Sequence, residues 1–180
     1  MNILVIKSSP HKNGSSNILA DNFIKGAEES GHSVTVFDAG HSNIHPCIAC
    51  EACDMSARCV QRDDMDELRK MILASDMLVF VTPLYYFGVS AQLKVVIDRF
   101  YSFNDELTAK RLKSAMIVAA TDEKNRTMRD IKSHYETLCR YLAFEDMGQI
   151  LGSGCGNVSM TEKSVFPKKA YEFGKSLGKR

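Results

Sequence analysis

The sequence lacks the features that would place it in a membrane or on a secretory route. Its longest apolar runs, residues 77–81 and 115–120, are far shorter than the roughly 20 residues that a membrane-spanning helix needs. The first residues, MNILVIKSSP, have no basic start and only a brief apolar stretch, unlike a signal peptide. We therefore expect a protein of the cytoplasm with no membrane partner, in a compartment where thiols stay reduced.

The sequence also lacks an excess of charge of either sign. Lys and Arg total 23 against 22 Asp and Glu, a net charge of +1 with neutral His. No long basic stripe is present, so we expect no nucleic-acid partner. There is no tryptophan, no internal repeat and no linker rich in Gly, Pro or Ser, while 44% of the residues are hydrophobic. These features predict one domain over residues 1–180.

Segments typical of strands and helices alternate along the whole chain. Apolar or alternating runs predict strands at residues 2–6, 33–37, 76–83, 114–121 and, more weakly, 147–152. Helical spacing of apolar residues predicts helices at 18–30, 63–74, 90–103, 127–143 and 167–178. Continuous apolar strands separated by helices indicate a parallel sheet covered on both faces. We expect an α/β fold, a flavodoxin-like three-layer α/β/α sandwich with a five-stranded parallel sheet in the order 2-1-3-4-5.

In such a fold, ligands bind beyond the carboxyl ends of the strands, and the first loop there is SSPHKNGSSN (residues 8–17). It combines hydroxyl, amide and cationic side chains with Gly14, which lets the backbone turn sharply. The N-terminus of the following helix adds free N–H groups and a favourable dipole. The loop therefore suits an anion, although it contains neither G-x-x-x-x-G-K-[ST] nor G-x-G-x-x-G. The alternative is an ordinary polar turn with a capping serine.

The second loop (residues 83–90) contains three consecutive aromatic residues, in the sequence TPLYYFGVSAQLK. A flat aromatic ligand could stack on them while backbone groups read its edge. Tyrosine and phenylalanine are also enriched at subunit interfaces, so the same residues could contact another copy of the chain.

Taken with PCIACEACDMSARCVQRDDM (residues 46–65), these two loops resemble those of the NAD(P)H-dependent FMN reductases of the flavodoxin-like superfamily. The resemblance implies that the FMN phosphate meets Ser9, His11, Ser15, Ser16 and Asn17. It implies that the flavin ring lies on Pro83, Leu84, Tyr85, Tyr86, Phe87 and Gly88. The third loop, which begins with Thr121 and Asp122, would approach the other side of the ring. This chain departs from the family in having His11 where Arg is frequent, and a third loop (TDEKNR, residues 121–126) without glycine.

The resemblance further implies an activity and an assembly. We expect an FMN-dependent NAD(P)H oxidoreductase that passes a hydride through FMN to a small acceptor such as a quinone, a nitro or azo compound, or a flavin. Because FMN supplies the redox chemistry, no side chain needs to be catalytic. The family implies a homodimer or homotetramer. A flavodoxin-like carrier of single electrons is an alternative, although such carriers are usually strongly acidic.

Cys47, Cys50, Cys53 and Cys59 follow the spacing C-x2-C-x2-C-x5-C. Bacterial ferredoxins bind clusters with C-x2-C-x2-C-x3-C-P. The spacing also resembles that of the iron–sulfur flavoproteins, in which a 4Fe–4S cluster relays single electrons to FMN, with ferredoxin as a candidate donor. Ordinary thiols remain the alternative, since family members without a cluster also carry cysteines here. Zinc and a disulfide are less favoured readings. We expect Cys139 to be buried in a helix, and we assign no role to Cys155.

Overall fold

The computed structural model describes residues 1–124 and 126–179; Asn125 of the third loop and Arg180 lie outside the described residues. Within the described part, five parallel strands form one sheet in the order β2-β1-β3-β4-β5. This order confirms the predicted flavodoxin-like topology. The strands are β1 (Asn2–Lys7), β2 (Ser33–Asp38), β3 (Met77–Pro83), β4 (Lys113–Ala119) and β5 (Glu145–Gly152).

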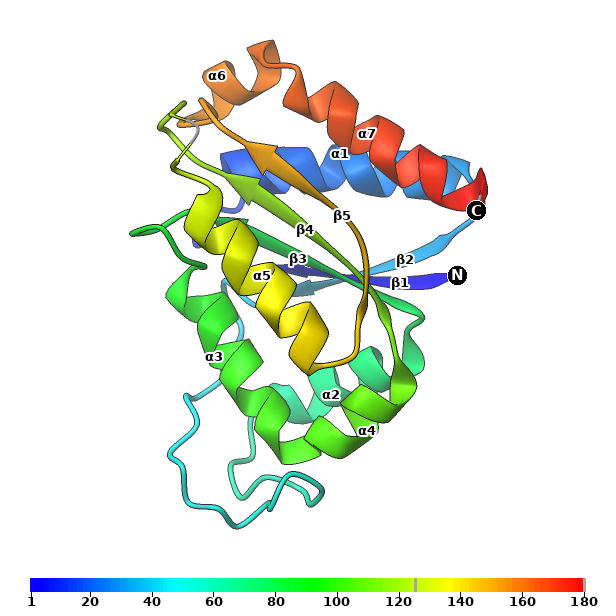
Figure 1. Ribbon diagram of the computed structural model, residues 1–180, viewed down its shortest axis with the longest axis vertical. Coiled ribbons are helices and arrows are strands. Elements are labelled where there is room, and N and C mark those ends of the chain that lie inside the picture. Colours follow the sequence, from blue (N-terminus) through cyan, green and yellow to red (C-terminus); the bar gives the residue numbers. More distant parts are fainter. Residues whose placement is uncertain (125, 180) are drawn as a thin grey trace.

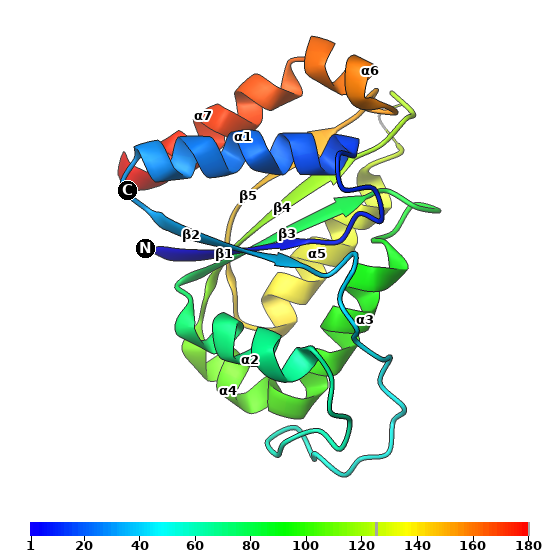
Figure 2. The same ribbon diagram turned by 180° about the vertical axis from the view of Figure 1, so that it is seen from behind.

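Helices cover both faces of this sheet (Figure 1). One face carries α1 (Ser15–Glu29), α6 (Val158–Lys163) and α7 (Phe166–Ser176), which ends in the short 3-10 helix η2 (Leu177–Lys179). The other face carries α2 (Met65–Ala74), α3 (Ala91–Arg99), the 3-10 helix η1 (Phe100–Phe103), α4 (Asn104–Lys110) and α5 (Arg129–Tyr141). Figure 2 shows the same three layers from behind. In the described part of the chain, no helix combines the length and the apolar character needed to cross a membrane.

The central strands are apolar because both of their faces are buried. Along β1, Ile3 and Val5 point into the core beneath α1 and α7, whereas Leu4 and Ile6 point into the core beneath α2, α3 and α5. Alternating side chains of a strand point to opposite faces, so a continuous apolar run is what a strand buried on both faces requires.

Two helices escaped the sequence analysis. The helix predicted at 90–103 ends at Arg99, continues as η1, and is followed by the separate helix α4. Phe103 leaves helical geometry (φ −145°, ψ 30°) and buries its ring in the core. The apolar spacing through this region therefore reflects two helices that share one core. No element was predicted at the six-residue helix α6 (Val158–Lys163).

The loops at the carboxyl edge of the sheet follow β1, β3, β4 and β5. The segment at residues 46–62, which we call the cysteine loop, lies elsewhere. In Figures 1 and 2 the chain leaves β2 at that edge, descends beside α3 and then loops below α2, where the cysteine loop lies away from the edge. The two regions singled out from the sequence are thus separate places on the protomer.

Candidate functional site

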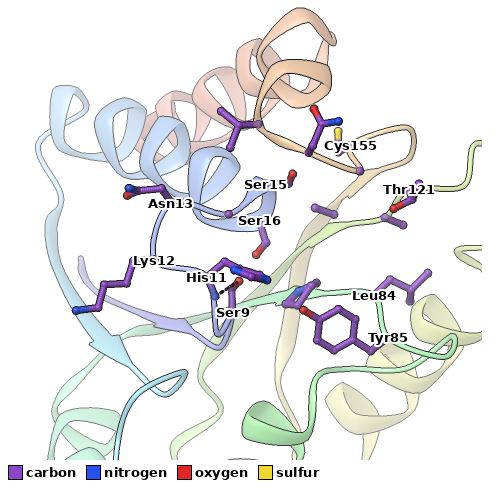
Figure 3. A pocket seen from close by; sticks show the side chains of 17 residues that line it. Ser9, His11, Lys12, Asn13, Ser15, Ser16, Leu84, Tyr85, Thr121 and Cys155 are labelled. Carbon is purple, nitrogen blue, oxygen red and sulfur yellow. Dashed lines mark hydrogen bonds between the residues drawn. The ribbon is translucent and has the colours of Figure 1, made fainter.

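A cavity of about 550 Å³ opens at the carboxyl edge of the sheet (Figure 3). The structure brings eight of the residues chosen from the sequence to its walls: Ser9, His11, Ser15, Ser16, Pro83, Leu84, Tyr85 and Thr121. Lys12, Asn13 and Gly14 complete the wall contributed by the first loop. Five of the chosen residues do not line the cavity: Asn17, Tyr86, Phe87, Gly88 and Asp122.

Hydrogen bonds within the first loop fix its shape. The Ser9 hydroxyl accepts from the His11 N–H at 3.2 Å, and the Gly14 N–H donates to the His11 carbonyl at 2.9 Å. The Asn17 side-chain amide donates to the carbonyls of His11 and Lys12 at 3.2 and 2.9 Å. Asn17 therefore shapes the loop from behind. A β carbon at Gly14 would lie 3.0 Å from both the Ser9 hydroxyl and the His11 carbonyl oxygen, so glycine suits this tight turn.

The start of α1 has the properties of an anion site. Its N-cap is Gly14, which provides no side-chain cap, so the first N–H groups of the helix remain for a ligand. Ser16 is only 1% exposed, yet its hydroxyl has no hydrogen-bond partner within residues 1–124 and 126–179. A buried hydroxyl without a partner is costly. A phosphate oxygen in the cavity would accept a hydrogen bond from it, so the residues present fit a phosphate group.

The second loop divides into a wall and an exposed tip. Pro83, Leu84 and Tyr85 line the cavity, and the Leu84 N–H donates to the Ala119 carbonyl at 2.8 Å, which fixes this wall to β4. The tip is Tyr86 and Phe87, which are 101% and 56% exposed. The wall supplies an apolar surface for a flat ring, whereas the aromatic tip stands outside the cavity.

The tip is a two-residue hairpin turn. The Tyr85 N–H donates to the Gly88 carbonyl at 3.1 Å, and the Gly88 N–H donates back to the Tyr85 carbonyl at 3.0 Å. Tyr86 and Phe87 have φ values of 46° and 65°, the left-handed conformation at both central positions that defines a type I′ turn. Asn and Gly normally occupy these positions, because bulky residues are strained there.

The sequence analysis did not identify a further wall of the cavity, which the segment after β5 forms. The cavity is also lined by Cys155, Gly156 and Asn157, between β5 and α6, and by Val158, the first residue of α6. The Cys155 N–H donates to the Ala120 carbonyl at 2.7 Å, and a β carbon at Gly156 would lie 2.9 Å from the Thr121 side chain. The signal was available, because β5 follows β4 in the predicted order and its loop must open at the same edge.

Asp122 has a structural place beside the site. Its carboxylate accepts from the Thr127 hydroxyl at 2.7 Å and from the Lys124 N–H at 3.1 Å. These hydrogen bonds, that of Thr127 foremost, hold the pKa of Asp122 below its ordinary value. Asp122 therefore shapes the start of the third loop as an anion, while Thr121 faces the cavity.

The four cysteines of the cysteine loop line a second cavity of about 340 Å³, together with Ile48 and Tyr101. Among the described residues, no three His, Cys, Asp or Glu side chains converge as the ligands of a single metal ion would. A 4Fe–4S cluster makes a different demand, because four cysteine thiolates hold it from around its outside. Four cysteines that line one cavity supply the number and type of ligands that such a cluster needs.

The backbone of the cysteine loop is unusual as well. Ala49, Glu51, Asp54 and Met55 have φ values of 52°, 58°, 40° and 60°. Left-handed positions are uncommon for residues other than glycine, and the Asp54 N–H donates to the Glu51 carbonyl at 3.1 Å within this segment. The cysteine loop is therefore a series of tight turns.

Comparisons with known proteins agree with this geometry. Residues 1–145 match the family of NADPH-dependent FMN reductases, and the chain belongs to that family. It is 36% identical over 110 residues to an iron–sulfur flavoprotein of Archaeoglobus fulgidus, an alignment that covers 61% of this chain and 50% of the relative. The chain spans about half the length of the iron–sulfur flavoproteins that it matches.

Two further matches extend over most of the chain. A Bacillus subtilis protein whose name describes an NAD(P)H-dependent FMN-containing oxidoreductase is 27% identical over 168 residues, and the alignment covers 86% of each chain. The solved structure of an NAD(P)H:quinone oxidoreductase from Methanothermobacter marburgensis superposes with a TM-score of 0.82 at 19% identity, over 98% of this chain and 96% of that one. This structural likeness establishes the flavodoxin-like fold.

Proposed function

We propose that this protein is an FMN-dependent NAD(P)H oxidoreductase of the cytoplasm. It passes a hydride through bound FMN to a small acceptor such as a quinone, a nitro or azo compound, or a flavin. The observation that carries the proposal is the meeting of an anion-binding loop and an apolar wall around one cavity of about 550 Å³. That volume falls within the roughly 300–1,000 Å³ of small-molecule sites, and family membership supports FMN as the ligand.

The first loop and the start of α1 would hold the FMN phosphate. The hydroxyls of Ser9, Ser15 and Ser16 line this end of the cavity, together with His11 and Lys12. Hydrogen bonds from hydroxyl and N–H groups to a charged acceptor are stronger than those between neutral partners. Asn17 acts indirectly, by holding the carbonyls of His11 and Lys12.

The second and third loops would hold the flavin ring. Pro83, Leu84 and Tyr85 form its apolar wall, and Thr121 approaches from the β4 side. Bound FMN supplies the hydride chemistry, so the side chains of this chain bind and orient it and exclude water. Tyr86 and Phe87 stand outside the cavity, where they are placed to contact another copy of the chain in a homodimer or homotetramer.

The decisive test is FMN titration of the purified protein, followed by anaerobic addition of NADH or NADPH. We expect saturable FMN binding at one site per chain, a higher melting temperature with FMN, and bleaching of the flavin absorption by one of the two nucleotides. Riboflavin, which lacks the phosphate, should bind more weakly. Failure to bind FMN would refute the proposal. FMN binding without oxidation of either nucleotide would favour a flavodoxin-like carrier of single electrons.

A second candidate function is that of an iron–sulfur flavoprotein, which relays single electrons between a 4Fe–4S cluster and FMN with ferredoxin as donor. The specific observation in its favour is that Cys47, Cys50, Cys53 and Cys59 all line one cavity. Iron, sulfide, zinc and flavin should be analysed on one anaerobically purified sample. About four irons per FMN would support the cluster. An iron-free protein would leave ordinary thiols, and one zinc per chain would point to a zinc site.

A further inference from the structure

The most deeply buried ion pair of the described residues, Arg99–Asp63, lies beside the cysteine loop. The side chain of Arg99, the last residue of α3, is 2% exposed, and that of Asp63 is 0% exposed. The Arg99 guanidinium donates to both carboxylate oxygens of Asp63, at 2.7 and 3.1 Å. Such a two-pronged, charge-assisted contact fixes both groups in orientation as well as in distance.

The pair joins the two ends of the cysteine loop. Arg99 also donates to the His45 carbonyl at 2.8 Å, and the Asp63 carboxylate accepts from the His45 N–H at 2.9 Å. The Met65 N–H donates to the same carboxylate at 3.1 Å, at the start of α2. His45 precedes the loop and Asp63 follows it, so both ends are held on one guanidinium–carboxylate pair. In the sequence, Asp63 stood only at the start of the helix predicted at residues 63–74.

The groups around Arg99 favour its charged form. Burial disfavours the charged form of Arg99, but the hydrogen bonds and charge of Asp63, with smaller contributions from Cys59 and Cys47, outweigh it and hold the pKa of Arg99 above its ordinary value. Arg99 is therefore a fixed cation near the first and last cysteines of the loop.

A buried ion pair joins two segments at a larger cost in free energy than an apolar contact would. Burial of two charges carries a large desolvation penalty, and the Arg99 Nε–H has no partner within the described residues. An apolar pair would pack here without that cost. What an apolar pair would not provide is a directional hold on the loop ends and a positive charge beside the thiols.

We propose that Arg99 is a positioning residue for the four thiols. Together with Asp63 it closes the base of the cysteine loop and holds Cys47 and Cys59 at the cavity before a cluster binds. Asp98 and Tyr101, on either side of Arg99, line the same cavity, so α3 and η1 form its rigid wall. This inference rests on the iron–sulfur candidate function and adds the residue that prepares the site.

The test compares anaerobic cluster assembly, at limiting iron and sulfide, in wild type, Arg99→Lys and Asp63→Asn. Arg58→Ala is the matched control, because it removes an exposed arginine of the same loop that pairs with Asp66 at 2.6 Å. Lysine keeps the charge but lacks the planar fork that reaches Asp63 and His45 together. We expect Arg99→Lys and Asp63→Asn to bind iron at least about 10-fold more weakly than wild type. Arg58→Ala should have the iron affinity of wild type.

Two readouts separate positioning from general stability. FMN content reports whether each variant retains the flavin site at the far end of α3. Hydrogen exchange in the cluster-free protein reports on the His45 and Met65 amides, which should exchange faster in Arg99→Lys and remain unchanged in Arg58→Ala. In Arg99→Lys protein loaded at excess iron, the paramagnetic resonance spectrum of the reduced cluster should change, while the flavin absorption should not.

The outcomes distinguish the two claims. A wild-type protein that assembles no cluster would overturn both the iron–sulfur function and this role of Arg99. A wild-type protein that loads, with Arg99→Lys equal to it in iron affinity, resonance spectrum and amide exchange, would overturn the role of Arg99 alone. Loss of FMN together with iron in Arg99→Lys would also overturn positioning, because the effect would then be a general loss of structure.

Discussion

The Ser90 hydroxyl donates to the Ser8 hydroxyl at 2.9 Å and lies 3.1 Å from the Ser8 carbonyl oxygen, and both side chains are fully buried. Ser8 lies where β1 enters the first loop, and its own hydroxyl donates to the Val81 carbonyl of β3 at 2.8 Å. Ser90 lies where the second loop enters α3, and its N–H donates to the Thr82 hydroxyl at 2.9 Å. The first and second loops, which form two walls of the cavity, are therefore hydrogen-bonded to each other through buried residues outside its lining.

Removal of this link should affect binding as well as stability. Ser90→Ala leaves the Ser8 acceptors unpaired and removes the N-cap of α3, where the Ser90 hydroxyl accepts from the Leu93 N–H. We expect the free energy of unfolding to fall by about 1–3 kcal/mol, and FMN to bind more weakly. Denaturant unfolding and FMN titration measure the two effects. Ser75→Ala is the control, since Ser75 is buried and, among the described residues, its hydroxyl bonds only the local Ile72 carbonyl; it should leave FMN affinity unchanged.

Ser16 gives a sharper test of the phosphate assignment. Its hydroxyl is buried and has no hydrogen-bond partner in the part of the chain that the structure describes, so Ser16→Ala should leave the apoprotein as stable as wild type or slightly more stable. In the complex the variant loses a hydrogen bond to a charged group, worth about 1.5–3 kcal/mol, or at least 10-fold in FMN dissociation constant. Riboflavin affinity should not change. Equal losses for FMN and riboflavin would show that Ser16 does not contact the phosphate.

The fold was readable from the sequence because burial leaves a strong pattern. Strands buried on both faces are continuous apolar runs, and the polar loops between strand and helix mark the carboxyl edge of the sheet. The first loop was found in this way, and so was the wall formed by Pro83, Leu84 and Tyr85. Both the first loop and this wall are formed by consecutive residues, so the local sequence was enough to find them.

Features that depend on tertiary contacts could not be read in this way. The sequence placed Asp63 at the start of a predicted helix but did not indicate its partner, Arg99, which α3 brings to it in the fold. The loop GSGCGN resembled any glycine-rich turn until β5 placed Cys155 against the carbonyl of Ala120. Tyr86 and Phe87 were read as part of the ring site, because a sequence does not reveal that a tight turn points three adjacent aromatic residues in different directions.

Cys139 should be an inert thiol, in contrast to those of the cysteine loop. Burial in α5 raises its pKa from 9.0 to about 11. A raised pKa means that the unfolded state loses the proton first, so this thiol's contribution to stability is complete below pH 9.0 and is lost as the pH rises toward about 11. Because only the thiolate reacts, alkylation of Cys139 should be about 100-fold slower than that of an ordinary thiol near neutral pH.

Mass spectrometry of reduced, iron-free protein after timed treatment with iodoacetamide measures this difference. Cys50, which is exposed, serves as the internal reference within the same sample. Labelling of Cys139 should rise about 10-fold for each pH unit while its thiolate is the minor form. Equal labelling rates for the two residues near neutral pH would show that α5 opens readily and that the thiol is not held in the core.

The strained tip of the second loop yields the last prediction. Tyr86 and Phe87 occupy left-handed positions, each at a cost of about 1–2 kcal/mol for a residue other than glycine. Tyr86→Asn with Phe87→Gly supplies the residues that a type I′ turn favours. Tyr86 has no burial to lose in the protomer, since it is 101% exposed. We therefore expect the double variant to unfold at a higher denaturant concentration when the protein is dilute and monomeric.

The same variant should bind FMN as wild type does, because neither residue lines the cavity, but it should assemble less well. Strain retained at an exposed aromatic tip is explained if the two rings are buried against a second copy of the chain. Sedimentation analysis over a range of concentrations would show a weaker homodimer or homotetramer. Tyr141→Asn, which changes a 63% exposed tyrosine at the end of α5, is the control and should leave assembly unchanged. If the double variant forms assemblies of the same mass as wild type, the tip does not lie in the interface. The strain at Tyr86 and Phe87 would then need another explanation.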